Sequence, residues 1–458
     1  MDKRRSEVGR DARPMGSRAD SIERQYRVDE ASRWVGAEKG VLMTEQAEAF
    51  LRFVGVDWGS EAHQVCVIDR SRKIVLEKAF AHSGKGLSEL VAAVLAAGGV
   101  DPEQVAVAIE VPRGAIVDTL LERGLAVFAI NPKQLDRFRD RHSVAGAKDD
   151  RRDALVLADS LRTDEPAFRR VRAGDPTLIE LRELGRIHEE LKAERIALGN
   201  RLREQMQRYF PQVLTIGNVY EDRWLWELLE KAPTPELAKR VSLAKIGSLL
   251  KRYRIRSLTP EAVREAVSAE ALHVAPGVLE ACRRHVALLL PRLRLVHEQK
   301  SAVEREIEAL LEKLSEPLEG KAEHRDARLL QSLPGLGKLV CATMLTEATE
   351  PLENRDYRSL RTLCGVAPVT KRSGKQHAVS MRTSCSRRLR TALFYWADNA
   401  TKREARWKER YAALRAAGHS HGRALRGLAD RLLALLVAVL KSGTPYDPAR
   451  RGRPTLAT

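Results

Sequence analysis

Short apolar runs near residue 50 restrict the fold of this chain more than any other feature. They occupy 53–60, 64–69 and 73–76, and polar turns separate them. Runs of this length joined by short turns predict antiparallel strands. Residues 87–97 then have helical spacing, 105–111 are a continuous apolar run, and a helix around 115–123 precedes a strand at 126–130. The pattern predicts a mixed α/β domain in which hairpin strands are followed by alternating helix and strand.

Acidic residues stand at the ends of two of these runs and at a later helix start. Asp57 and Glu110 each follow apolar residues, and Asp150 and Asp153 lie three apart in Ala-Lys-Asp-Asp-Arg-Arg-Asp-Ala-Leu. The order of elements is that of ribonuclease-H-like domains, which present acidic residues on neighbouring strands. A carboxylate beside buried strands is costly unless a positive charge neutralises it. Together the four acids predict a divalent-metal site.

Each acid also has a purely structural interpretation. Asp57 before Trp-Gly is compatible with a turn. Asp150 as an N-cap and Asp153 in the first helical turn would favour the helix dipole. Glu110 is harder to explain this way, because Val-Ala-Val-Ala-Ile before it reads as a strand covered on both faces. A helix starting near 150 would place Asp150 and Asp153 on one face, so the two interpretations are compatible.

The charge of the chain indicates its partner. The 458 residues include 80 Lys plus Arg against 62 Asp plus Glu, a net charge of +18. Excess positive charge is typical of proteins that bind a polyphosphate backbone, although a basic protein without such a partner is the alternative. The five cysteines lack Cys-x-x-Cys spacing and fit a reducing cytoplasm. No apolar stretch of about 18 residues or signal peptide is evident, so we expect neither secretion nor membrane insertion.

The rest of the chain divides by pattern. Residues 1–45 are polar and read as a disordered or non-native extension, with Met43 as the expected native start. Residues 175–318 carry leucines at three- and four-residue steps among charged residues, which predicts long helices forming a coiled coil, a dimer seam or a bundle wall. Pro291 interrupts the second of these stretches. A further domain spans 325–442, and 443–458 read as a disordered tail.

The C-terminal region holds two motifs of interest. Pro-Gly-Leu-Gly-Lys, ending at Lys338, predicts a turn between helices whose backbone N–H groups could hold a phosphate. A plain helix–helix connection is the alternative. Residues 387–431 carry many Arg and Lys with Trp396 and Trp407 interleaved, and we interpret this stretch as contacting phosphates rather than as a solvated face.

Several motifs together resemble the DEDD transposases of the IS110 insertion-sequence family. They are Val-Gly-Val-Asp57-Trp-Gly-Ser, Ile-Glu110, Ile130-Asn131-Pro132-Lys133-Gln134 with Phe138-Arg139, and 147–155. The resemblance implies a RuvC-like domain at 50–165. It also implies a catalytic tetrad of Asp57, Glu110, Asp150 and Asp153 that binds Mg²⁺ or Mn²⁺. This chain has the additional acid Asp149, so either Asp149 or Asp150 could be the third acid of the tetrad.

The C-terminal resemblance covers 363–368, 371–375 and 387–393. It implies that Ser373, before Gly374 in a basic loop, is a nucleophile, with Ser380 and Ser384 as competing serines. A serine hydroxyl needs activation and nearby positive charge. The expected nucleic-acid-binding residues are Lys338, Lys371, Arg372, Lys375, Arg387, Arg388 and Arg390.

The resemblance implies a DNA recombinase that cuts and rejoins DNA through a phosphoserine intermediate. Its implied partners are donor and target DNA, a guide RNA from the element and further protomers in a homodimer or tetramer, with no membrane. The implied location is the cytoplasm of a bacterium or archaeon, with the nucleoid. Two alternatives remain: a RuvC-like nuclease that hydrolyses DNA with the tetrad alone, and a catalytically inactive nucleic-acid-binding protein.

Overall fold

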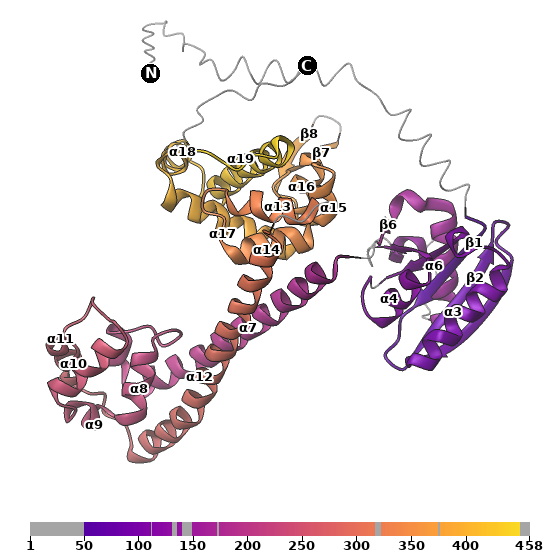
Figure 1. The fold of residues 1–458 in the computed structure, drawn as a ribbon. Coiled ribbons are helices and arrows are strands. Elements are labelled where there is room, and N and C mark those ends of the chain that lie inside the picture. The colour runs from indigo at the N-terminus through magenta and orange to yellow at the C-terminus, as the bar shows by residue number, and fades with distance from the viewer. Residues whose placement is uncertain are drawn as a thin grey trace, which may run out of the picture. The chain divides into compact units, whose positions relative to one another are not determined.

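The structure is a computed structural model of the chain. It describes residues 50–110, 112–130, 135–139, 149–171, 174–316, 322–373 and 376–448. The expected extension at 1–45 and the end of the expected tail lie outside these residues. The chain divides into two compact units, Met1–Ala173 and Gly174–Thr458, and each is described here by itself (Figure 1).

A twisted mixed sheet forms the centre of the first unit. Its strands follow the order β3-β2-β1-β4-β5-β6. The outer hairpins are antiparallel, whereas β1 runs parallel to β4 and β4 parallel to β5. The antiparallel start and the following parallel strands confirm the order predicted from the apolar runs. The strands are β1 Arg52–Asp57, β2 Ala62–Asp69, β3 Ile74–Ala81, β4 Val105–Ile109, β5 Ala126–Ala129 and the short β6 Arg169–Arg170.

Helices cover both faces of this sheet. Helices α3 (Gly84–Gly98) and α4 (Ala115–Glu122) pack on one face, where their apolar side chains share a core with alternate residues of β1, β2 and β4. Helix α6 (Asp150–Asp164) packs on the other face against the remaining residues. All five residues of β4 are therefore buried, as the continuous apolar run indicated. Short 3₁₀ turns lie at Pro102–Gln104 and Glu165–Ala167.

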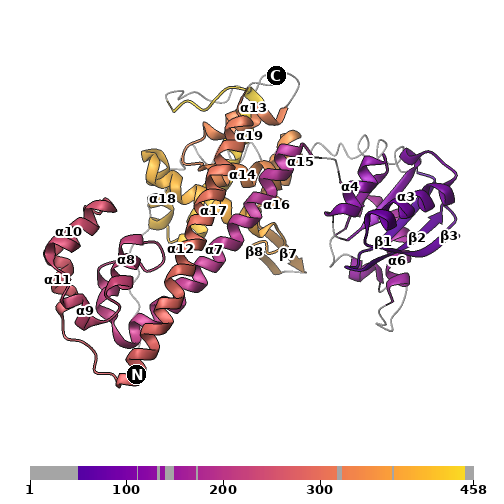
Figure 2. The ribbon, with the colours of Figure 1, turned by 60° about the horizontal axis from the view of Figure 1, so that its bottom comes forward.

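Two long helices form the stalk of the second unit. Helix α7 spans Pro176–Tyr209 and α12 spans Pro276–Lys313. The start of α7 shares a core with the end of α12, and the end of α7 shares another with the first half of α12, so the pair is antiparallel (Figure 2). The expected interruption at Pro291 is wrong, because α12 continues through it. Proline removes one backbone donor from a helix, and packing over many turns outweighs that loss here.

A small helical module connects the far ends of the stalk helices. Trp224, Trp226 and Tyr209 are fully buried in its core, together with stalk residues such as Val286. No separate module was predicted within 175–318 from the sequence. Its elements are a 3₁₀ turn at Pro211–Thr215, α8 Arg223–Lys231, α9 Pro235–Lys239, α10 Leu243–Arg252 and α11 Pro260–Ser268.

The C-terminal part of the second unit is helical apart from one hairpin. It shares its core with the start of α7 and the end of α12. Trp396 and Trp407 belong to this core and are 0% and 2% exposed. The elements are α13 Ala322–Gln331, α14 Lys338–Glu347, α15 Thr349–Glu353, α16 Tyr357–Leu363, β7 Val369–Ser373, β8 Gln376–Ser380, α17 Arg387–Arg403, α18 Ala405–Ala416 and α19 His421–Ser442.

The five cysteines all lie in described segments and are free thiols. Within the described ranges, no helix is long and apolar enough to cross a membrane.

Candidate active site

Neighbouring parallel strands bring the first two acids together. Val56 of β1 pairs with Ile109 of β4. Asp57 directly follows Val56, and Glu110 directly follows Ile109. Because carboxyl ends of parallel strands meet at one edge of a sheet, the two carboxylates lie side by side there. The side chain of Glu110 is 29% exposed, so solvent reaches this edge.

Helix α6 supplies the other two acids from its first turn. Asp149 is its N-cap and accepts a hydrogen bond from the backbone N–H of Arg151 at 3.2 Å. The interpretation of Asp150 as the N-cap is therefore wrong, since Asp150 is the first helical residue and remains exposed. Asp153 is 8% exposed. Because the carboxylate of Asp149 is engaged as the N-cap, Asp150 is favoured over Asp149 as the acid that acts together with Asp153.

Glycine at position 55 lets α6 approach the strand that carries Asp57. A Cβ atom at Gly55 would lie 1.8 Å from the backbone oxygen of Ala154 and 2.7 Å from the backbone nitrogen of Ala158. No other residue fits without moving the helix. Since Ala154 follows Asp153, this contact fixes the distance between the helix acids and Asp57.

The electrostatics of Asp57 show that the four carboxylates lie close enough to repel one another. Burial, and after it the charges of Asp153, Asp150 and Glu110 in that order of effect, together raise the pKa of Asp57 to about 6. The charge of Arg139 acts in the opposite direction. A carboxyl group whose neighbours are acidic is typical of sites that bind cations.

Arg139 is the cation that this cluster contains. Its Nε donates to Oδ1 of Asp153 at 2.9 Å and its Nη2 donates to Oδ2 at 3.0 Å. Nη2 also lies 4.0 Å from Glu110, and Nη1 donates to Asp136 at 2.8 Å. The sequence showed Arg139 only as part of a motif. Its role as a partner of the acids depends on a contact across 14 residues, which no local pattern predicts.

The donor set fits a hard divalent cation in its chemistry. Four carboxylates are the oxygen ligands that Mg²⁺ and Mn²⁺ prefer, and Asp57 is destabilised in its charged form unless a cation is near. Among the described residues, no group of three or more His, Cys, Asp or Glu side chains is arranged to hold a metal ion. The guanidinium of Arg139 supplies the positive charge between Asp153 and Glu110 instead.

The expected nucleophile lies at the tip of the hairpin in the second unit. Ser373 ends β7 and pairs with Gln376, the first residue of β8. Gly374 and Lys375 lie outside the described residues, as do the side chains of Ser373 and Lys371. The competing serines differ in place, because Ser380 ends β8 and exposed Ser384 lies in the segment before α17.

Several expected nucleic-acid contacts already have protein partners. Lys338 Nζ lies 3.0 Å from Glu308, and Arg390 donates to the backbone oxygen of Arg382 at 2.6 Å. Arg372 and Arg387 are exposed, and neither side chain forms an ion pair with another described residue. Their contact with nucleic acid stays a prediction, whereas the partners of Lys338 and Arg390 favour structural roles for these two.

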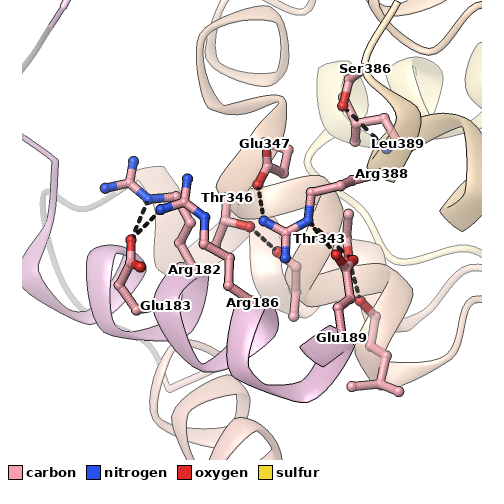
Figure 3. A network of polar contacts seen from close by, with 12 residues as sticks. Arg182, Glu183, Arg186, Glu189, Thr343, Thr346, Glu347, Ser386, Arg388 and Leu389 are labelled. Carbon is pink, nitrogen blue, oxygen red and sulfur yellow. Dashed lines mark hydrogen bonds and ion pairs between the residues drawn. The ribbon is translucent and has the colours of Figure 1, made fainter. Parts of the chain in front are cut away.

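Arg388 is the most completely paired of these residues. Its guanidinium lies between Glu347 of α14 and Glu189 of α7 (Figure 3). Nη1 donates to Glu347 at 2.8 Å, and Nε donates to Glu189 at 3.0 and 3.1 Å. The side chain is 22% exposed. Arg388 thus joins α17 to the stalk, and its expected contact with nucleic acid would require breaking these bonds.

Comparison with known proteins identifies the family. A family model described as "Transposase" matches residues 54–211, and one described as "Transposase IS116/IS110/IS902 family" matches 327–412. A putative transposase for the IS117 mini-circle of Streptomyces coelicolor is 30% identical over 414 residues, which cover 88% of this chain and 97% of the relative. The chain belongs to the IS110 family of transposases.

Two further relatives agree with this assignment. A putative transposase of Sinorhizobium fredii is 47% identical over 250 residues, covering 54% of this chain and 67% of the relative. An uncharacterized protein of insertion element IS900 from Mycobacterium paratuberculosis is 26% identical over 412 residues. The match covers 87% of this chain and 97% of the relative. Transposases cleave and join DNA, so this IS110-family chain is an enzyme with DNA as its substrate.

Proposed function

We propose that this transposase cuts and rejoins DNA in a reaction in which Ser373 forms a covalent bond to DNA and the acids Asp57, Glu110, Asp150 and Asp153 assist. The observation that carries the proposal is the gathering of these acids at one edge of the sheet, where burial and the charges of Asp153, Asp150 and Glu110 raise the pKa of Asp57 to about 6. Four acids gathered at one edge of a sheet are costly to keep without a cationic ligand.

The acids would hold Mg²⁺ or Mn²⁺, which stabilises the attacking and leaving oxygens of a phosphoryl transfer when bound. Binding such a cation requires Asp153 and Glu110 to share or release the guanidinium of Arg139. The close contact of α6 with Gly55 keeps the acids in place while this exchange occurs.

Ser373 would supply the nucleophile from the tip of the β7–β8 hairpin. Its hydroxyl oxygen attacks the DNA phosphorus, its proton passes to a base, and the departing DNA oxygen takes up a proton. One phosphorus–oxygen bond forms as another breaks, so the bond energy is kept for rejoining. Exposed Arg372 lies beside it, and Lys371 of the same strand and Lys375, two residues further along the sequence, would add positive charge for the phosphate.

The family resemblance extends the proposal to partners. A guide RNA from the element would pair with donor and target DNA, and two or four protomers would assemble around it in the cytoplasm. The antiparallel pair of α7 and α12 offers an exposed apolar surface for assembly, since Leu288 and Leu295 are 70% and 55% exposed. Treatment with ribonuclease should abolish target recognition if the guide is RNA.

The test of the nucleophile is a covalent adduct. The protein is expressed in cells with the DNA of its own element, and SDS-resistant protein–DNA adducts are measured. We expect adducts from wild type and their loss in Ser373→Ala and Asp57→Ala. Ser380→Ala and Ser384→Ala are the matched controls and should retain adducts. Metal-dependent cuts that persist in Ser373→Ala without any adduct would overturn the serine mechanism and favour the hydrolytic nuclease.

A further inference from the structure

A cluster of aromatic rings, exposed apart from the half-buried Tyr411, lies where α17, α18 and α19 meet. We call Phe394, Tyr395, Tyr411 and His421 the aromatic patch. The ring centroids of Phe394 and Tyr395 are 6.1 Å apart, those of Phe394 and His421 5.7 Å, and those of Tyr411 and His421 5.9 Å. The three helices are the gold elements of the second unit (Figure 1). The rings therefore form one continuous surface contributed by three helices.

The patch stays in solvent although the core lies one residue away. Phe394 and Tyr395 are 40% and 46% exposed, whereas the next residue, Trp396, is fully buried. Burying an aromatic side chain is strongly favourable. Contiguous exposed rings consequently mark a surface that binds a partner.

Basic residues lie beside Tyr395 and on the same helices as the patch. Nζ of Lys192 lies 5.0 Å from the centroid of the Tyr395 ring. Arg387 lies seven residues before Phe394 on α17, which places both on the same side of the helix. Arg423 lies in the first turn of α19, two residues after His421. Arg387 and Arg423 are exposed, and neither side chain has an ion-pair partner in the part of the chain that the structure describes.

The start of α19 adds to this positive potential. The helix has 22 residues, begins at His421 and carries no acidic residue in its first turn. His421 Nδ1 and the hydroxyl of Tyr411 are hydrogen-bonded at 2.9 Å, which fixes the two rings relative to each other. The surface thus combines ring faces held by the fold with cations and a helix N-terminus.

We propose that the aromatic patch binds unpaired nucleotides of a DNA strand. The bases would stack on the rings of Phe394 and Tyr395, and the phosphates would contact Arg387 and Arg423. Every base has a π-face, so such stacking depends little on sequence. Nucleic acid is favoured over a protein as the partner because basic residues accompany the rings and the chain has a net charge of +18. A polyanion complements this charge. The proposal rests on the proposed function, because cutting and rejoining strands exposes unpaired DNA.

The test measures binding of a single strand by the purified full-length chain. The probe is an oligothymidylate of about 20 nucleotides that carries 2-aminopurine, whose fluorescence falls when it stacks. We expect the dissociation constant to rise by about tenfold or more in the double variant Phe394→Ala/Tyr395→Ala, with loss of the fluorescence change, since each stacked base contributes about 1–3 kcal/mol. A duplex of the same length should bind within about threefold of its wild-type affinity.

Two controls separate stacking from damage to the fold. Phe394→Tyr/Tyr395→Phe keeps both rings and should bind like wild type. Leu243→Ala/Leu272→Ala removes exposed apolar side chains elsewhere in the same unit and should also bind like wild type. Arg423→Gln should weaken binding and flatten its salt dependence while leaving the 2-aminopurine change at saturation intact.

Other outcomes overturn the proposal. Unchanged single-strand affinity in the double variant would do so, as would an equal loss of duplex affinity. A changed oligomeric state by light scattering would assign the patch to contacts between copies of the chain. Loss confined to an unstructured RNA of equal length would assign it to RNA. The binding assay requires no strand cleavage, so absence of covalent adducts from wild type, together with normal single-strand binding, would reject the proposed function without rejecting the role of the aromatic patch.

Discussion

At the scale of single residues, Asp57 carries the electrostatic cost of the acidic cluster. Its pKa rises from 3.8 to about 6 because it is partly buried and faces Asp153, Asp150 and Glu110. A raised pKa means that the folded chain holds the proton more tightly than the unfolded chain. Below pH 4 both states are protonated and the effect vanishes. Above pH 6 both are ionised, and the full penalty opposes folding.

The pH dependence gives a prediction for Asp57→Asn. Without divalent cations, the melting temperature of the first unit should be higher in the variant than in wild type above pH 6, and the two should converge towards pH 4. We expect a gain of about 1 kcal/mol, because solvent screening reduces the effect at a half-exposed group. Differential scanning calorimetry in EDTA measures it. Equal melting temperatures of wild type and Asp57→Asn at pH 8 would contradict the claim that ionised Asp57 is destabilised by burial and by its acidic neighbours.

At the scale of elements, short sequence features decide how helices meet. Gly335 has φ +69°, and a Cβ atom there would lie 2.6 Å from the backbone nitrogen of Ala400 in α17. The turn between α13 and α14 therefore packs directly on α17, and the indole of Trp396 donates to the backbone oxygen of Pro334 at 2.9 Å. The expected turn between helices is confirmed, and its glycine serves packing.

The two glycines of this turn form a matched pair. Gly335→Ala should destabilise the second unit by more than about 2 kcal/mol, because it combines a clash with backbone and an unfavourable φ. Gly337→Ala meets nothing within 4 Å and should change stability by less than about 0.5 kcal/mol. Urea unfolding followed by tryptophan fluorescence compares them. Equal stability of the two variants would show that the turn does not pack on α17 in this way.

Arg387 and Arg388 are neighbours with different expected roles. Arg388→Ala should destabilise the second unit by about 1–3 kcal/mol, because it leaves Glu347, 21% exposed, without its partner. Arg387→Ala should leave stability unchanged and weaken nucleic-acid binding, with a smaller salt slope. Thermal melts and filter binding distinguish the two. A reversed outcome, with Arg388 governing binding and Arg387 governing stability, would contradict the assignment.

At the scale of the whole molecule, the sequence predicted the strand order and the acids because both follow from local runs and strand ends. It missed Arg139, whose partners lie far along the chain, and the module at 211–275. Burial at 389, 392, 393, 396, 397 and 400 follows helical spacing, so that spacing on α17 could have placed Trp396 in the core and Phe394 outside it.

The central claim is that the acids of one unit and Ser373 of the other serve one reaction. The direct measurement is the transposition frequency in cells of a copy of the element that carries a resistance marker, with wild type, Asp57→Asn, Ser373→Ala and Ser384→Ala at equal protein levels. The account predicts that the transposition frequency falls by at least about a hundredfold in Asp57→Asn and in Ser373→Ala. It predicts the wild-type frequency in Ser384→Ala. Transposition that continues in Ser373→Ala at the wild-type frequency would contradict it.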